Sequence, residues 1–121
     1  NISAHVPPAS ESLYPTGPVK AGGLLDKLLS DYPNLYADMS AGSGYNALSR
    51  DREFTAGFIE RHPQQMLFGS DCPCYDGNGK NFKGTCFSKQ LQAFIRELVT
   101  DQVTLRNIFH DNAMRALEPA A

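Results

Sequence analysis

The chain has 121 residues, of which 41% are hydrophobic, 20% charged and 10% aromatic. This length allows one ordinary domain, and the composition is typical of a folded protein rather than a disordered one. Eleven basic and thirteen acidic residues give a net charge of −2, and without a dense basic patch we expect no nucleic-acid partner. No apolar run approaches the roughly 20 residues of a membrane helix. Because three cysteines cannot form a closed set of disulfides, we expect a reduced, cytoplasmic protein.

Residues 1–20 are predicted to be a loop-like lead-in rather than the first element of a domain. The chain begins Asn1-Ile2-Ser3, a Pro- and Ser-rich stretch follows, and residues 14–18 contain turn-forming Pro and Gly. We therefore expect residues 1–121 to be a single partial domain from a longer protein.

The next part of the chain is predicted to alternate between helix and strand. Leucines recur at helical spacing over residues 24–32 until Pro33 interrupts the pattern. Residues 35–40 have the composition of a short strand. A second helix follows, for which Ser49 or Asp51 can act as the N-cap.

The second half of the chain continues this alternation. Residues 66–70 are predicted to form a buried strand, and residues 72–87 a long loop after it. Two more helices are expected to begin at Ser88 and at Thr100 or Asp101. The order of helix, strand, helix, strand, helix, helix is typical of parallel βα units, so we predict an α/β protein with two adjacent parallel strands.

Asp71 directly follows the second predicted strand, in the sequence FGSDCP at residues 68–73. Enzymes built on parallel strands keep their active sites at the carboxyl ends of those strands, which makes Asp71 a candidate catalytic residue. The alternative is an aspartate that only caps or turns the chain after the strand. The residues alone leave both interpretations open.

Three segments together resemble a known family. They are YPNLYADMSAGSG at residues 32–44, LFGSDCP at 67–73 and RNIFHDNAMRAL at 106–117. In this order they resemble the carboxyl-terminal part of the amidohydrolase-related family, and most closely its branch of metal-dependent hydrolases and aminocarboxymuconate-semialdehyde-type decarboxylases. The similarity spans residues 14–118.

This resemblance implies that the chain is the C-terminal part of a distorted (β/α)8 TIM-type barrel. It also implies a divalent metal at the strand ends, with zinc as the first choice and manganese or another divalent ion as alternatives. Asp71 would match the family's final-strand aspartate, which binds the metal and accepts a proton from the metal-activated water. Such an enzyme hydrolyses a C–N or C–O bond of a small-molecule substrate. With the same ligands it can instead be a non-oxidative decarboxylase.

The other metal ligands of the family are not found in this sequence. It has no His-x-His pair, and its three histidines are His5, His62 and His110. His5 is either a ligand or a loop histidine, His62 is expected at a helix end where the dipole favours it, and His110 is expected to be structural or solvated. Because one aspartate cannot hold a catalytic metal, we expect the isolated chain to be inactive.

Two further groups of residues are candidates for binding. Ser40, Asn46 and Arg50 lie near a glycine-rich segment at residues 41–44, which we interpret as a loop at the rim of the active site. They are therefore predicted to contact substrate, and the alternative is that they are ordinary polar residues of the surface.

Cys72, Cys74 and Cys86 form a second candidate site. They could supply three thiolates to zinc, although a structural zinc site usually has four protein ligands. The alternatives are a disulfide between Cys86 and either Cys72 or Cys74, or three free thiols. For the chain as a whole, the alternative to an enzyme is a non-catalytic α/β module that completes its sheet with a partner, and a homo-oligomer remains open.

Overall fold

The computed structural model describes residues 2–4 and 13–118, so the candidate ligand His5 lies outside the described residues. The elements follow one another in this order: α1 (Leu24–Asp31), β1 (Ala37–Asp38), α2 (Ala41–Ser49), α3 (Arg52–Arg61), β2 (Met66–Leu67), α4 (Phe87–Leu98), α5 (Gln102–Arg106), the π-helical turn η1 (Asn107–Asp111) and α6 (Asn112–Leu117).

The two strands are adjacent and parallel, as the sequence predicts. Ala37 of β1 lies opposite Met66 of β2. Past the regular strands the backbones stay joined, because the Ala41 N–H donates to the Ser70 carbonyl at 3.0 Å. The strands are shorter than the predicted ranges 35–40 and 66–70, but their direction and pairing are confirmed.

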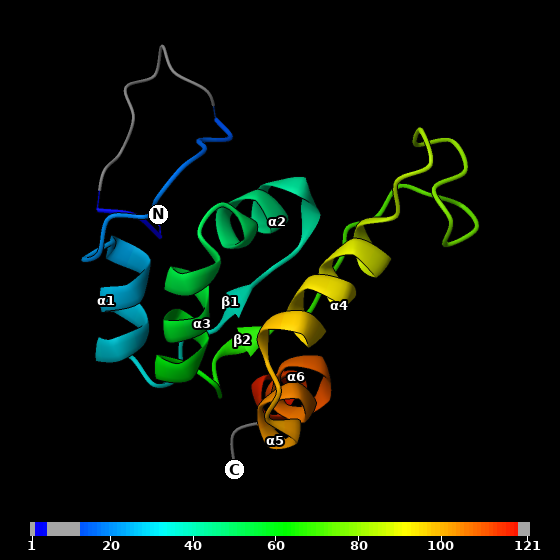
Figure 1. Cartoon of the computed structure of the whole chain (residues 1–121). Coiled ribbons are helices and arrows are strands. Elements are labelled where there is room, and N and C mark those ends of the chain that lie inside the picture. Colours follow the sequence, from blue (N-terminus) through cyan, green and yellow to red (C-terminus); the bar gives the residue numbers. More distant parts are fainter. Residues whose placement is uncertain (1, 5–12, 119–121) are drawn as a thin grey trace.

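The predicted TIM-type barrel is wrong for this chain. In the described part the sheet has two strands of two residues each, and the other regular elements are helical. A barrel closes only when about eight strands curl together with a consistent tilt. Figure 1 shows instead α1 and α3 side by side on one side of the strands, and α4 on the opposite side. The fold is therefore a helix-rich arrangement around a small parallel sheet.

The glycine-rich segment predicted to be a rim loop is in fact the start of helix α2. Its glycines serve close packing, since a Cβ on Gly44 would lie 2.2 Å from the Met39 carbonyl oxygen. Two helices rather than one therefore connect the strands. The second of these is α3, and Asp51 caps it as predicted by accepting the Phe54 N–H at 3.0 Å.

The core lies between the helices and the two strands. Its most completely buried apolar side chains are Leu29, Met39, Phe58, Ile59, Met66, Leu91, Ile95 and Ile108. Burial of each such side chain contributes about 1.5–3 kcal/mol. None of the helices in the described part of the chain is both long enough and apolar enough to cross a membrane.

The carboxyl-terminal helices are tied to the second strand. Asp101 caps α5 as predicted, while α4 begins after Cys86 rather than at Ser88. Asn112 is completely buried, and its Nδ2 donates to the carbonyl oxygens of Pro63 at 3.1 Å and Met66 at 2.8 Å. The asparagine of the RNIFHDNAMRAL segment thus fixes α6 against the beginning of β2.

Candidate functional site

The chain after β2 passes close to the end of β1 at Gly69. A Cβ at this position would lie 2.2 Å from Ser40 Oγ and 3.0 Å from Asp38 Oδ1, so only glycine allows this approach. Asp38 Oδ1 accepts the backbone N–H of Ser40 at 2.8 Å and the Ser40 hydroxyl at 2.5 Å. Asp38 is therefore the aspartate that caps the turn at this edge, and Ser40 is occupied by it.

Asp71 differs from this neighbour in two ways. Its backbone φ is 46°, in the left-handed region that non-glycine residues seldom adopt and that is found at functional sites. Its side chain is exposed, and no hydrogen bond or ion pair joins it to another described residue, whereas the seven other aspartates all accept a donor within the same ranges. Asp38 thus caps the turn after β1, while the positive φ of Asp71 places it in a turn after β2, as the alternative interpretation of Asp71 expects.

The described residues do not build a metal site around Asp71. Among residues 2–4 and 13–118, the group of three potential ligands that lie close together consists of cysteines and does not include this aspartate. A catalytic zinc needs about three protein ligands. A catalytic metal at Asp71 would therefore need ligands from beyond these residues.

Asn46 and Arg50 hold the lead-in segment against α2. Asn46 Nδ2 donates to the Pro15 carbonyl at 3.1 Å, and Arg50 Nε donates to the Gly17 carbonyl at 2.9 Å. In the described structure neither side chain forms a hydrogen bond or ion pair with Asp71. Substrate binding by Ser40, Asn46 and Arg50 stays a prediction, and these contacts give each of them a structural task.

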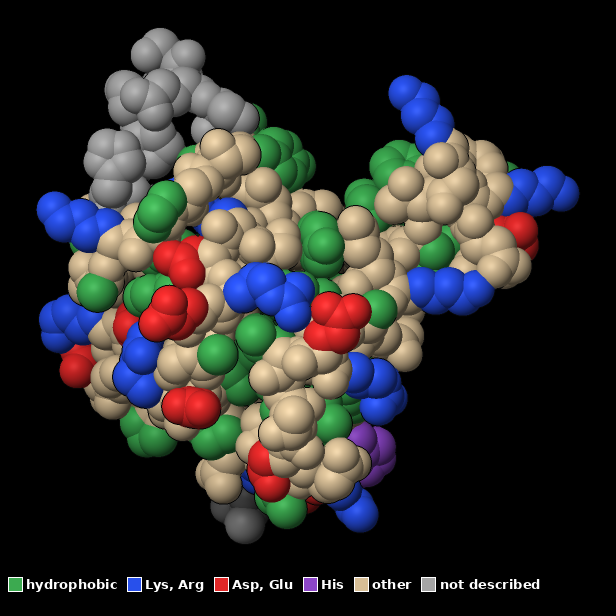
Figure 2. All heavy atoms as spheres, in the orientation of Figure 1, with side chains coloured by type: hydrophobic (Ala, Val, Ile, Leu, Met, Phe, Trp, Pro, Cys, Tyr) green, Lys and Arg blue, Asp and Glu red, His purple; other side chains and the backbone are tan. Residues whose placement is uncertain are grey.

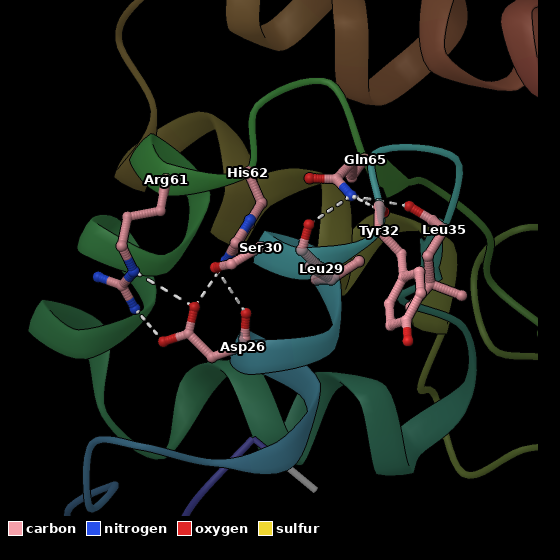
Figure 3. Close-up of polar contacts among 8 residues, drawn as sticks. All are labelled: Asp26, Leu29, Ser30, Tyr32, Leu35, Arg61, His62 and Gln65. Carbon is pink, nitrogen blue, oxygen red and sulfur yellow. Dashed lines mark hydrogen bonds and ion pairs between the residues drawn. The ribbon is translucent and has the colours of Figure 1, made fainter.

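His62 belongs to a polar cluster that joins α1 to α3 (Figure 3). It follows the last turn of α3, as the sequence predicts, with 3% of its side chain exposed. Asp26 of α1 lies between His62 and Arg61, with Oδ1 2.6 Å from His62 Nε2 and Oδ2 2.6 Å from Arg61 Nη2. Burial raises the pKa of Asp26, but hydrogen bonds from Arg61 and His62 outweigh it, so that the pKa lies below its ordinary value.

Gln65 extends this connection toward β1. Its Nε2 lies within 3.0 Å of the carbonyl oxygens of Leu29, Tyr32 and Leu35, and so holds the end of α1 and the chain that leads to β1 (Figure 3). No periodic or motif signal in the sequence marks Gln65. His110, in contrast, lies at the surface as predicted, with Nδ1 2.7 Å from the Asp111 carboxylate.

The three cysteines lie together where the long loop meets α4. Cys72 Sγ is 3.0 Å from Cys74 Sγ and 3.9 Å from Cys86 Sγ, and all three sulfurs lie within 4.8 Å of one another. None of them is in a disulfide. The backbone N–H of Phe87 donates to Cys72 Sγ at 3.2 Å. This cluster is close enough to bind a metal ion.

Hydrogen bonding shifts the pKa values of Cys72 and Cys74 in opposite directions. The Cys74 thiol, followed by the backbone N–H of Cys74, stabilises a Cys72 thiolate and lowers the pKa of Cys72 to about 7. The same interaction with Cys72 raises the pKa of Cys74. One thiolate in the cluster is thus available near neutral pH.

No family model, curated protein or solved structure matches this chain. The resemblance to the amidohydrolase-related family therefore depends on the three sequence segments alone.

Proposed function

We propose that this chain is the carboxyl-terminal part of a metal-dependent hydrolase similar to the amidohydrolase-related enzymes, and that Asp71 is the residue that it contributes to the reaction. The observation that carries this proposal is the exposed carboxylate of Asp71, which has no hydrogen-bond donor among the described residues and follows one of two parallel strands. Active sites of enzymes with parallel strands are built at the carboxyl ends of those strands.

The carboxylate of Asp71 is accessible to an incoming water molecule. The neighbouring Asp38 differs, because its carboxylate accepts two hydrogen bonds from Ser40. Asp71 has no such donor among the described residues and is open to solvent. It can therefore take a proton from a water molecule that attacks a small-molecule ester, lactone or amide.

The proposed enzyme also needs a metal ion, and most of the ligands of this ion must come from outside the described residues. A divalent ion supplies an acidified water in enzymes of this kind. Because no second histidine or carboxylate joins Asp71 in a group of three ligands here, those ligands have to come from elsewhere in a longer protein.

A pair of isosteric substitutions tests the role of Asp71. In the intact protein that contains this chain, turnover is measured on a panel of aryl esters, lactones and anilides at matched metal content. Asp71→Asn removes the base without changing its size, and we expect kcat to fall by about 10²–10⁴-fold. Asp38→Asn is the matched control at the neighbouring strand end, and it keeps an oxygen that accepts from Ser40.

Near-wild-type turnover by Asp71→Asn would contradict the assignment and favour a non-catalytic module. Product analysis adds a second readout, since hydrolysis releases an acid together with an alcohol or amine, whereas a decarboxylase releases carbon dioxide from a carboxylate substrate.

A further inference from the structure

The loop between β2 and α4 begins and ends at the cysteine cluster. Residues 68–86 contain no helix or strand, and Figure 1 shows this loop projecting away from the helices. Cys72 and Cys74 lie at its beginning, and Cys86 is the residue that precedes α4. The three thiols thus lie where the projecting part of the loop begins and where it ends.

We propose that Cys72, Cys74 and Cys86 together bind one thiophilic metal ion, with Zn²⁺ as the expected ion. Thiolates are the ligands that select zinc and other soft ions, and zinc–sulfur bonds of about 2.3 Å in a tetrahedral site place the sulfurs about 3.8 Å apart. The sulfurs here lie from 3.0 Å to at most 4.8 Å apart, which spans this value. Three sulfurs leave the fourth coordination position open to water or another donor.

The start of α4 favours negative charge at this place. The Phe87 N–H is in the first turn of a twelve-residue helix and donates to Cys72 Sγ. Unpaired N–H groups and the helix dipole stabilise anions there. Binding of Zn²⁺ changes no oxidation state: each cysteine that is still a thiol releases its proton to the solvent, and three thiolates with one Zn²⁺ leave the site with one negative charge.

The shape of the loop gives the ion a structural task. Six of its residues have positive φ values, namely Asp71, Gly77, Gly79, Asn81, Lys83 and Gly84. Most of its side chains are exposed, and Figure 2 shows basic side chains on its projecting end. Phe82 packs against Phe87, and Asn81 Nδ2 donates to the Pro73 carbonyl at 3.0 Å within the loop. A metal ion would add a crosslink between its two ends, and a pocket of about 350 Å³ is lined in part by Cys86 and Lys89.

A disulfide satisfies this geometry less well than a metal. The closest pair of sulfurs is 3.0 Å apart, compared with about 2.05 Å for a disulfide bond. Any one disulfide would also leave the third thiol of the cluster unused. A metal ion engages all three sulfurs, and the proposal does not depend on the function assigned to Asp71.

Cobalt substitution tests the site directly. The intact protein is reduced, freed of metal and titrated without oxygen with Co²⁺, and Zn²⁺ is then added in competition. We expect thiolate-to-cobalt charge-transfer bands in the near ultraviolet, with intense visible bands of a tetrahedral site, which one equivalent of Zn²⁺ removes. These bands report sulfur ligands and are independent of any hydrolytic activity.

Two variants locate the ion. Cys74→Ser changes a half-buried loop residue, and we expect it to weaken Zn²⁺ binding by at least about 100-fold, since even loss of a residue that only supports a ligand costs 10–100-fold. Asp71→Ala, next to Cys72, should keep the bands. Their absence in the wild type, their survival in Cys74→Ser, or their loss in Asp71→Ala would each overturn the proposal. Matching circular dichroism of metal-free Cys74→Ser and wild type excludes a folding defect.

Discussion

Removal of the Asp26 carboxylate should destabilise the junction between α1 and α3, because this carboxylate contacts both His62 and Arg61. The side chain of Asp26 is 16% exposed. Its two partners differ in burial, since the His62 side chain is 3% exposed and the Arg61 side chain is 46% exposed. In Asp26→Ala the His62 ring nitrogen loses its acceptor inside the protein. An unsatisfied buried polar group costs about 1–3 kcal/mol.

The Arg61 contact adds less. Because almost half of the Arg61 side chain is exposed, its ion pair with Asp26 contributes only about 0–1 kcal/mol. The expected loss of unfolding free energy for Asp26→Ala is therefore about 1–4 kcal/mol. In a domain of this size, that loss corresponds to a decrease in Tm of roughly 10 °C.

Urea unfolding followed by far-ultraviolet circular dichroism measures this loss, and Arg61→Ala is the matched control. The control removes the exposed partner but leaves His62 bonded to Asp26, so we expect it to cost at most about 1 kcal/mol. If Asp26→Ala costs no more than Arg61→Ala, the buried His62 contact does not stabilise the junction, and the reasoning is refuted.

Two further predictions concern stability. Because the pKa of Asp26 is lower in the folded chain than its ordinary 3.8, its contribution is complete above pH 3.8 and is lost as the pH falls through the lower folded value. Urea titrations from pH 6 to pH 2.5 should show this loss in the wild type, and a smaller one in Asp26→Asn, which has no carboxyl group to titrate. Asn112→Ala should lower the unfolding free energy by about 2–4 kcal/mol, because the Pro63 and Met66 carbonyls lose their buried donor; a Tm within 2 °C of the wild type would contradict this role of Asn112.

Local signals in the sequence predicted the elements that depend on local chemistry. Asp51 and Asp101 each cap the helix that follows because their side chains accept a backbone N–H three residues ahead. The start of α2 was missed for the opposite reason. Gly42 and Gly44 have low helix propensity, and the benefit of Gly44 comes from its close approach to the Met39 carbonyl, which no local rule reveals.

The contacts that build the polar cluster and the cysteine cluster join residues that are far apart in the sequence. Asp26 and His62 are 36 residues apart, and Cys72 and Cys86 are 14 residues apart. The sequence indicated that the three cysteines could act together, but not that they lie within 4.8 Å. No periodic or motif signal identifies Asp26 as the partner of His62, because the two residues are brought together only by the packing of α1 against α3.

The barrel was an expectation of a different kind, since it came from the resemblance and not from the periodicity of the chain. Periodicity predicted two strands, and the described residues contain two. Two strands fix the relative direction of their carboxyl ends, which is the part of the prediction that places Asp71. They do not fix how many strands surround them.

The adjacent side chains of Asp71 and Cys72 lie in different chemical environments. With a φ of 46°, Asp71 turns the chain as it leaves β2. The carboxylate before the turn is exposed and has no donor in the described structure, whereas the sulfur of Cys72 just after it is half-buried and accepts the Phe87 N–H. An exposed carboxylate and a half-buried thiol thus occupy adjacent positions in the chain. A metal held by the cysteines would fix the backbone on one side of Asp71, as the contacts of Gly69 with the end of β1 fix it on the other.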